Sequence, residues 1–524
     1  MPSSSRWPAA WPRKPSLAEQ PAISWRETAL AQLGADAFDV LVVGGGITGA
    51  GIARDAALRG LTVALIEQDD FAAGTSSKSS RLIHGGVRYL EHGYLKLVFE
   101  ASRERRALLR NASHLVRPLR FTWPVYRGAR IPRWKVRAGL ALYDMLALFR
   151  NVGRHSGLSR AGVLDAEPAL KADDLLGGAS YWDAATDDSA LTLANVLDAR
   201  EAGAVALNHA TVERLTESDM RITGAIVTDG LTNHCVTVRA RVVVNATGPW
   251  TDSIRRMEDP HSTPAVLGTK GVHISVPAHR VGNRAAVTML SPVDGRVMFC
   301  LPAGEQTIVG TTDTATDAHP DQVRASRADV QYLLDSVNGF FPGAALGPRD
   351  VIAAWAGIRP LVSSGNSGDP ASASREHEIT TGPKGVVAIS GGKLTTYREI
   401  AEQVTNLVAR RVGKTAARCT TAERVLPGAR RQPVFGLLFE PILEGQQWTL
   451  SDATNAVEHE MACTLTDILV RRTKVAFASR DHGIPQAARV AGAIARHMGW
   501  DAGECARQVE MYRAEAARLF DIDP

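Results

Sequence analysis

A short apolar run followed by a glycine-rich turn constrains the fold of this 524-residue chain more than any other feature. Residues 40–43 are all apolar, as is typical of a buried parallel strand. Gly44, Gly46 and Gly49 follow with the spacing G-x-G-x-x-G, and a helical pattern comes next. This order of strand, turn and helix is that of the first unit of a doubly wound α/β fold. We therefore expect an α/β domain that holds a dinucleotide at this turn.

Each glycine of the turn has its own physical role. Gly44 permits the tight turn, Gly46 lets the backbone approach a pyrophosphate, and Gly49 lets helix and strand pack closely. A second apolar strand, residues 62–66, follows the helix and ends at Glu67, whose carboxylate can accept hydrogen bonds from an adenosine ribose. The strand before the glycines and the acid about twenty residues after them make the motif more specific than an isolated glycine pattern.

Two later segments favour FAD over NAD as the dinucleotide. Residues 240–254 contain another apolar strand, which ends in Thr247 and Gly248. The stretch "GVVAISGGKLTTYREI" contains a strand, then Gly391 and Gly392, then a helix. This second glycine turn would bring a helix N-terminus to a flavin ring or its ribityl chain. Because a long insertion separates these strands, the cofactor fold is split, whereas an NAD domain is usually continuous.

Composition narrows the classes of function. The five cysteines lie far apart with no C-x-x-C pair, which predicts neither a disulfide framework nor a metal site and favours a reducing compartment. No apolar run reaches the ~18–20 residues that a membrane-spanning helix needs. The N-terminal stretch has no apolar core of a signal peptide, and its prolines oppose an amphipathic transit helix. We expect residues 1–36 to be a disordered tail.

Positive charge is concentrated between Arg103 and Arg160. This segment contains fourteen Lys and Arg residues but only two acidic residues, a local excess of +12 in a chain of net charge +5. This excess indicates an anionic partner, either a membrane surface or, less favoured, nucleic acid. Residues 130–150 form an apolar helical stretch with basic flanks and Trp134. Such a helix suits a membrane interface and equally a buried position in a second domain.

The chain resembles the FAD-dependent (aerobic, respiratory) glycerol-3-phosphate dehydrogenases. The matching stretches lie roughly between residues 38 and 475, over nearly all of the chain: "GGGITGAGIARDAALRGL", "TSSKSSRLIHGGVRYLEHG", "NATGPW", "VGTTDT", "GIRPL", "GGKLTTYR", "VLPG" and "RRTK". The stretches "SSRLIHGGVRYLEHG" and "GGKLTTYR" are specific to that family, whereas the glycine fingerprint is shared by many flavoproteins.

The resemblance implies an α/β fold with three parts. An FAD-binding Rossmann-like domain of the glutathione-reductase/D-amino-acid-oxidase type would occupy residues 37–410, discontinuously, with an interleaved α+β substrate-capping domain. A mostly helical C-terminal domain would occupy residues 411–524. Between "VLPG" and "RRTK" this chain is shorter than its relatives by a few tens of residues, so the helical domain is expected to be shortened.

The resemblance also implies an activity and partners. The reaction would be oxidation of sn-glycerol 3-phosphate to dihydroxyacetone phosphate, with hydride transfer to FAD and electrons passing to a membrane quinone. The protein would be peripheral on the cytoplasmic face of the inner membrane or cytoplasmic, and a homodimer is compatible with the pattern. Neither a metal ion nor nucleic acid is expected.

Residues 75–95, "TSSKSSRLIHGGVRYLEHGYL", are predicted to be part of the active site because they follow the second strand of the dinucleotide fold. His84 is a candidate base, since a histidine has an ordinary pKa of ~6.5, and is also a candidate flavin contact. Arg88 and Tyr89 can reach substrate. The remaining groups would bind phosphate or flavin through hydroxyls, or let the backbone pass close to a planar ring: Thr75, Ser76, Ser77, Gly85 and Gly86.

The other candidate residues lie in the second half of the chain. Arg359 and Arg375 offer planar forks suited to phosphate oxygens, and the resemblance places phosphate-binding arginines at both positions. It also places Lys393 near flavin and substrate, as the rival of His84 for the role of base, and Thr395 near the cofactor. Asp313, just after a strand, can orient a substrate hydroxyl or be a simple turn residue.

Other functions remain compatible with the sequence. The same scaffold can serve an oxidase that passes electrons to oxygen. A flavin-dependent amine or hydroxy-acid oxidoreductase would need an arginine for a carboxylate but not a pair for phosphate. A non-enzymatic flavin-binding or RNA-associated scaffold has only the arginine-rich segment in its favour.

Overall fold

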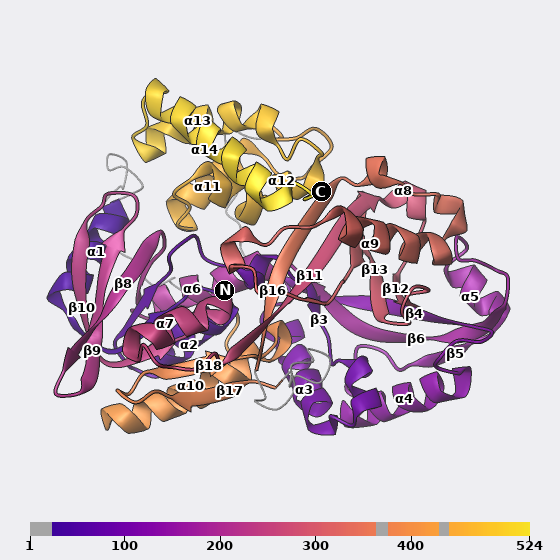
Figure 1. Ribbon diagram of the computed structural model, residues 1–524, viewed down its shortest axis with the longest axis horizontal. Coiled ribbons are helices and arrows are strands. Elements are labelled where there is room, and N and C mark those ends of the chain that lie inside the picture. The colour runs from indigo at the N-terminus through magenta and orange to yellow at the C-terminus, as the bar shows by residue number, and fades with distance from the viewer. Residues whose placement is uncertain (1–23, 363–375, 429–439) are drawn as a thin grey trace, which may run out of the picture.

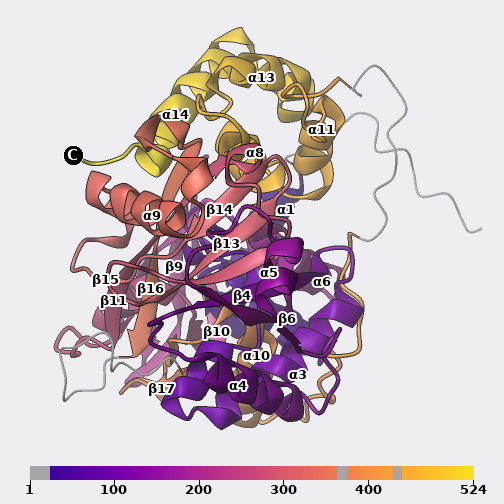
Figure 2. The same ribbon diagram turned by 90° about the vertical axis from the view of Figure 1, so that its right-hand side faces the viewer.

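The computed structural model describes residues 24–362, 376–428 and 440–524. Figure 1 shows one sheet on the left, a larger sheet on the right and the C-terminal helices, in yellow, above them. Figure 2, turned by 90°, shows the same helices at one end of the molecule. Within the described residues, no helix is both long and apolar enough to cross a membrane.

The first sheet has eight strands, in the order β17-β18-β10-β1-β2-β7, with β9 beside β10 and β8 beside β9. The neighbours from β18 to β7 are parallel, which explains their continuous apolar runs. The strands are β1 (Ala37–Val43), β2 (Val63–Ile66), β7 (Val205–Leu207), β8 (Ala210–Ser218), β9 (Arg221–Asp229), β10 (Cys235–Asn245), β17 (Glu378–Thr381) and β18 (Val387–Ser390).

Helices cover both faces of this sheet. Alternate residues of β1 point to opposite sides, so Val40 and Val42 join one core while Leu41 and Val43 join another. The first core is covered by α2 (Ile47–Leu58), α6 (Asp188–Glu201) and α10 (Tyr397–Val412), and the second by α1 (Ser24–Ala35) and α7 (Thr251–Glu258). The predicted boundary after residue 410 falls in the last turn of α10.

The expected disordered tail is wrong for residues 24–35, which form α1. Leu30 and Leu33 are buried against the sheet. Arg26 is also buried, forms an ion pair with Asp229, and donates a hydrogen bond of 2.7 Å to the carbonyl oxygen of Asn208. The prolines that suggested a tail end at residue 21, so they do not interrupt this helix. Residues 1–23 lie outside the described part of the chain.

The second sheet has ten strands, in the order β15-β11-β14-β13-β12-β4-β6-β3, with β16 beside β11 and β5 beside β6. It is antiparallel except where β12 runs parallel to β4. The strands are β3 (Leu82–Ile83), β4 (Val116–Tyr126), β5 (Ser156–Leu158), β6 (Leu175–Thr186), β11 (Val266–Pro277), β12 (Ala286–Leu290), β13 (Val297–Ala303), β14 (Gln306–Gly310), β15 (Thr314–Ala315) and β16 (Ala353–Val362). They come from two insertions into the first sheet, which confirms the split fold.

Helices also flank the second sheet. They are α3 (Leu95–Asn111), α4 (Arg133–Leu146), α5 (Arg160–Ala166), α8 (Ala278–Val281) and α9 (Arg327–Phe340). The C-terminal part, from residue 440 on, contains α11 (Leu450–His459), a π-helical turn (Asp467–Arg472), α12 (Val475–Ala478), α13 (Ile484–Met498) and α14 (Ala502–Phe520). Its helices share one apolar core with the second sheet, so the two parts pack as a unit.

Candidate active site

A cavity of about 520 Å³ lies at the carboxyl ends of β1, β2, β10 and β18, with β11 and β16 on its other side. Ligands of open parallel sheets bind at this end of the strands. The predicted cofactor residues that line it are Gly44, Gly46, Glu67, Thr75, Ser76, Thr247, Gly248, Gly391 and Gly392. The predicted catalytic and substrate residues that line it are His84, Tyr89, Arg359 and Lys393. The structure thus brings together groups from both halves of the sequence.

The first glycine turn is closed by steric contacts that only glycine permits. Gly44 has a φ of 104°, and a Cβ atom there would lie 2.7 Å from the carbonyl oxygen of Ala246. A Cβ atom at Gly49 would lie 1.9 Å from the carbonyl oxygen of Gly44, which is the close packing expected of the third glycine. Gly46 faces the cavity and precedes the first turn of α2. A phosphate group could therefore approach the N-terminus of this helix.

Glu67 links this turn to the loop after β2. Its Oε2 accepts a hydrogen bond of 2.6 Å from the amide of Gly45, and its Oε1 accepts one of 2.8 Å from the amide of Asp69. Burial raises the pKa of the Glu67 carboxyl to about 7, although the two amides act in the opposite direction. The carboxyl therefore lies at the cavity wall, where ribose hydroxyls could donate to it.

Two further glycine turns, after β10 and after β18, also line the cavity. Gly391 and Gly392, after β18, have φ values of 74° and 91°, which favour glycine. After β10, the amide and hydroxyl of Thr247 both donate to Oδ1 of Asn245, and Gly248 has a φ of 57°. The glycines of these turns add no side chain to the cavity wall, which suits the close approach of a flat ring.

The stretch of residues 75–95 divides into lining and supporting residues. The Thr75 hydroxyl donates to the carbonyl oxygen of Ile358 at 2.6 Å, and Oγ of Ser76 accepts from the amide of Ile47 at 2.9 Å. The amide of His84 donates to Oγ1 of Thr395 at 3.1 Å, which joins the backbone of His84 to the segment that follows Gly391 and Gly392. Among the described residues, Ser77 and Thr395 are buried and do not line the cavity.

Gly85 and Gly86 do not line the cavity among the described residues, and the reason for glycine here differs from the predicted one. A Cβ atom at Gly85 would lie 2.3 Å from the hydroxyl oxygen of Tyr143. At Gly86, which has a φ of 77°, it would lie 2.3 Å from the ring of Tyr89. The amide of Gly85 donates to the buried carboxylate of Asp183. Gly85 therefore lets the chain pack against α4, and Gly86 leaves room for the ring of Tyr89.

Arg359 projects from β16 into the cavity and is held by the loop after β14. Its Nη1 donates to Oδ1 of Asp313 at 3.0 Å, and its Nη2 donates to the hydroxyl of Thr311 at 2.8 Å. Asp313 itself does not line the cavity in the described part of the chain, and its carboxylate instead holds the guanidinium of Arg359. Arg375 and the side chain of Arg88 lie outside what the structure describes.

Lys393 and Tyr89 meet across the cavity. The Lys393 Nζ atom lies 3.5 Å from the centroid of the Tyr89 ring, a cation–π contact between the second glycine turn and the 75–95 stretch. The lysine comes directly before the short turn that begins α10. A cation is thus held at a cavity that His84 also lines.

His273 lines the cavity and was missed from sequence. It lies on β11, its Nε2 is 2.8 Å from the Ser80 hydroxyl, and its ring stacks on Trp355. Burial lowers the pKa of His273 to about 3, and the nearby Arg359 and Arg81 guanidinium groups act in the same direction. The imidazole is therefore neutral at ordinary pH. The sequence feature that could have identified this residue is a histidine within the apolar run "GVHISVP".

Lys78 is a second missed lining residue. Burial, followed by the positive charge of Arg518, lowers its pKa to about 8. Cations, imidazoles and glycine turns thus surround one cavity, an arrangement that can hold a dinucleotide beside a small anionic substrate.

Comparisons with known proteins agree with this geometry. The family model described as FAD dependent oxidoreductase matches residues 39–398, and the model described as the C-terminal domain of alpha-glycerophosphate oxidase matches residues 400–505. The aerobic glycerol-3-phosphate dehydrogenase of Staphylococcus haemolyticus is 37% identical over 408 residues, which cover 77% of this chain and 73% of that protein. That of Staphylococcus saprophyticus is 37% identical over 396 residues, 75% of this chain and 71% of that protein.

Solved structures show the same architecture. The glycerol-3-phosphate dehydrogenase from Bacillus halodurans, complexed with FAD, superimposes with a TM-score of 0.75 at 30% identity and covers 95% of this chain and 98% of its own. The alpha-glycerophosphate oxidase from Mycoplasma pneumoniae, with FAD bound, has a TM-score of 0.57 at 17% identity over 76% of this chain and 100% of its own, a likeness of fold alone. The predicted fold class and the predicted FAD are thus confirmed, and the chain belongs to the family of FAD-dependent aerobic glycerol-3-phosphate dehydrogenases.

Proposed function

We propose that this protein oxidises sn-glycerol 3-phosphate to dihydroxyacetone phosphate and passes the electrons to a membrane quinone. The observation that carries the proposal is that Arg359 lies in the same cavity as the glycine turns, fixed by Asp313. An oriented guanidinium beside a dinucleotide site suits a substrate that is both an alcohol and a phosphate ester. The substrate of the named relatives has this chemistry.

The residues around the cavity fit FAD. The first glycine turn and Glu67 would hold its adenosine diphosphate half, and the turns at Thr247–Gly248 and Gly391–Gly392 would hold the flavin half. When bound, FAD supplies a ring that accepts a hydride from the carbinol carbon of the substrate.

Two arginines would hold the substrate phosphate in this proposal. Arg359 is already oriented by Asp313 and Thr311, so little side-chain freedom is lost when a phosphate binds. Arg375 is proposed as the second, from the resemblance. Fixing the phosphate restricts the carbinol carbon, which is three bonds from the phosphorus atom, and this is the positioning that hydride transfer needs.

His84 would accept the hydroxyl proton. The structure adds His273 as a rival, but its pKa of about 3 makes it a much weaker base than an ordinary imidazole. We therefore give His273 the role of a hydrogen-bonding neighbour of the substrate, held in place by Ser80. Lys393, on the face of Tyr89, would stabilise negative charge that develops on the substrate oxygen.

An exposed apolar surface on the second domain supports membrane docking. We name it the α3–α4 surface: Tyr94, Leu95, Phe99, Trp134, Met145, Leu148, Phe149 and Val152. Trp134 is 71% exposed and Phe149 is 61% exposed, and α3 and α4 are in contact. Val136, Leu140 and Tyr143 of α4 are buried, whereas Trp134 and Met145 are exposed. The helix thus has one side buried in the protein and another that could lie at a membrane interface, the two positions expected for residues 130–150. It lies within the basic segment, which suits an anionic membrane.

An anaerobic stopped-flow experiment tests the proposal. Glycerol 3-phosphate should bleach the flavin, and a soluble quinone analogue should restore its colour. A reduced flavin that is not reoxidised by the quinone but yields stoichiometric peroxide with oxygen would favour the oxidase alternative. Bleaching by an amino acid and not by glycerol 3-phosphate would exclude the proposed substrate.

A further inference from the structure

One short C-terminal segment bonds directly to one of the two loops that carry cofactor-lining residues and is linked to the other through Asp188 of α6. We call residues 471–474 the RRTK segment; it comprises the end of the π-helical turn and the two residues after it. The first loop, residues 67–70, follows β2 and contains Glu67. The second, residues 75–80, contains Thr75, Ser76 and Ser79, which line the cavity. The first loop bonds the first glycine turn through Glu67. The second loop begins at the same turn, where Ser76 bonds Ile47, but its far end bonds His273 on β11 through Ser80. That far end would therefore meet the flavin half of the dinucleotide, and the first loop the adenosine half.

The arginines of the segment hold the first loop through Asp70. Nη1 and Nη2 of Arg472 donate to the two carboxylate oxygens of Asp70 at 2.7 and 2.9 Å. Nε of Arg471 donates to the same carboxylate, which is fully buried. Asn208 adds a hydrogen bond of 3.1 Å to Oδ1 of Asp70. The side chain of Asp70 is therefore fixed by charge-assisted bonds that come from the C-terminal domain.

The position of Asp70 is transmitted to the glycine turn. Asp70 is three residues after Glu67, whose carboxylate accepts from the amides of Gly45 and Asp69. The amide of Ala72, two residues beyond Asp70, donates to the carbonyl oxygen of Gly45 at 3.2 Å. The loop thus meets the turn on both sides of Asp70, so a shift of Asp70 would move Glu67 relative to the phosphate-binding backbone.

Lys474 holds the second loop through Asp188. Its Nζ lies 3.4 Å from Oδ1 of Asp188 and also bonds the hydroxyl of Ser189. The other oxygen of Asp188 accepts from the Ser79 hydroxyl at 2.7 Å and from the Ser79 amide at 3.2 Å. Ser80, the next residue, bonds His273. The contact therefore extends from the C-terminal domain to the wall on which substrate would lie.

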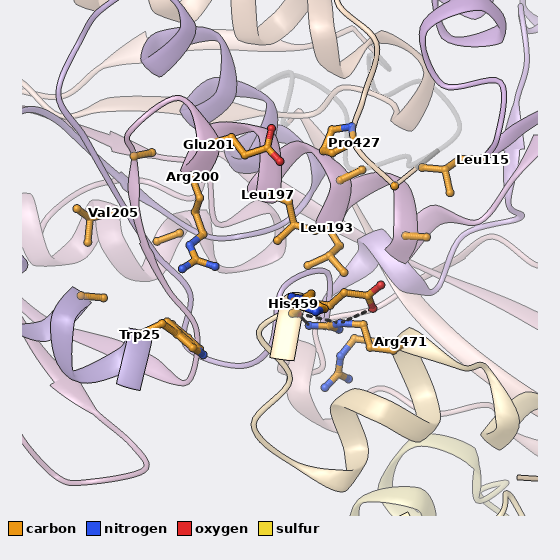
Figure 3. A pocket seen from close by; sticks show the side chains of 18 of the residues that line it. Trp25, Leu115, Leu193, Leu197, Arg200, Glu201, Val205, Pro427, His459 and Arg471 are labelled. Atoms are coloured by element: carbon orange, nitrogen blue, oxygen red, sulfur yellow. Dashed lines mark hydrogen bonds and ion pairs between the residues drawn. The ribbon is translucent and has the colours of Figure 1, made fainter. Parts of the chain in front are cut away.

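Two residues of the segment, Arg471 and Arg472, also line a groove. Figure 3 shows this groove, of about 1950 Å³, whose lining includes Trp25, Leu193, Leu197 and Arg200 as well as Arg471. None of the described residues of the glycine turns lines it. Buried ion pairs contribute little net stability compared with apolar packing of the same volume. Paired charges at this place are therefore better suited to fixing a position than to strengthening a core.

We propose that Arg471, Arg472 and Lys474 are positioning residues for the cofactor: the arginines fix the adenosine side through Asp70, and the lysine fixes the flavin side through Asp188. This inference rests on the proposed function, because it assigns the two loops to the two halves of FAD. It makes cofactor affinity depend on a domain that contributes no residue of the glycine turns.

The test separates the two halves with ADP as a probe. Full-length Arg472→Gln and Lys474→Gln would be stripped of FAD, and dissociation constants for FAD and ADP measured by flavin fluorescence and competition. Arg472→Gln should weaken both ligands about tenfold, equivalent to ~1.4 kcal/mol. Lys474→Gln should weaken FAD similarly and leave ADP within about twofold of wild type. Arg472→Lys should recover part of the ADP affinity, since it retains the charge but not the fork.

Arg513→Gln is the matched control, because Arg513 is an exposed arginine of α14 paired with Glu510. Melting temperatures with and without FAD complete the test. Unchanged FAD and ADP affinities in both variants, or equal loss of melting temperature with and without FAD, would overturn the proposal and leave the segment a structural contact. If Arg472→Gln does not fold, the FAD and ADP constants of Lys474→Gln still decide. A wild-type protein that binds no FAD would instead refute the proposed function.

Discussion

Arg359 on β16 lies over Gly271 on the neighbouring strand β11, and only a glycine leaves room for it there. A Cβ atom at Gly271 would lie 2.4 Å from Nη2 of Arg359. The absence of a side chain on one strand thus lets the guanidinium on the next strand reach the cavity and its partner Asp313.

Gly271→Ala should therefore impair substrate binding through Arg359. The new methyl group would displace the guanidinium from Asp313, so KM for glycerol 3-phosphate should rise at least about tenfold. Bound flavin should remain stoichiometric. Gly139→Ala, on α4 with open space around it, is the matched control and should behave as wild type. An unchanged KM in Gly271→Ala would show that the arginine does not need its observed position.

Arg359→Ala and Arg375→Ala should each lose phosphate contacts. A hydrogen bond to a charged group contributes ~1.5–3 kcal/mol, which corresponds to ~10–150-fold in affinity. Steady-state kinetics should show this loss with glycerol 3-phosphate and little change with unphosphorylated glycerol. Equal losses on both substrates would point to misfolding instead.

His84→Asn should slow flavin reduction by ~10²–10⁴ with little change in substrate affinity, because the base acts in the chemical step. Single-turnover stopped flow across a pH series measures this, and an inflection near neutrality should disappear. The same series on His273→Asn and Lys393→Met separates the rivals, since the variant that abolishes the inflection identifies the base. A rate in His84→Asn within a few-fold of wild type would remove His84 from the role.

FAD affinity should rise with pH through neutrality because of Glu67. Its folded-state pKa, about 7, lies above the ordinary value of 4.5. The proton it holds stabilises the FAD-free protein below pH 4.5, and this contribution is lost as the pH rises to about 7. Since the ionised carboxylate is the better acceptor for ribose hydroxyls, the FAD dissociation constant should fall between pH 6 and 8. Glu67→Gln should bind FAD more weakly at pH 8 and lose this pH dependence; a wild-type dissociation constant independent of pH would contradict the assignment.

The α3–α4 surface should bind anionic vesicles in a salt-sensitive manner. Each basic residue near such a surface contributes ~1 kcal/mol, and salt screens it. Trp134→Ala combined with Phe149→Ala should reduce the binding that remains at high salt. Met220→Ala, equally exposed but on the β8–β9 hairpin, is the control. Cosedimentation that is indifferent to lipid charge and salt would refute electrostatic docking.

Local motifs were predictable because their causes are local. The packing of Gly49 on Gly44 and the positive φ of Gly391 follow from a few neighbouring residues, so the sequence alone identifies the turns. The family resemblance added Arg359 and Lys393, which line the same cavity although neither has a local pattern of its own.

The residues that were missed or misinterpreted depend on partners distant in sequence. Gly85 accommodates Tyr143, which lies on α4. His273 looks like a core residue of an apolar strand until β16 is placed beside it, with Trp355 as its register partner. The helix α1 was overlooked because its stability comes from burial against the sheet, and its own sequence has no clear apolar stripe.

Because the RRTK segment lies near the end of the chain, the proposed role of this segment also determines when during synthesis FAD can bind. Domains fold from the N-terminus as the ribosome releases them, and the glycine turn emerges first. The guanidinium partners of Asp70 emerge only when almost the whole polypeptide has been made. A nascent chain can thus form its first strands but not a cofactor loop held by all its partners, and a chain terminated before residue 471 should leave the ribosome colourless.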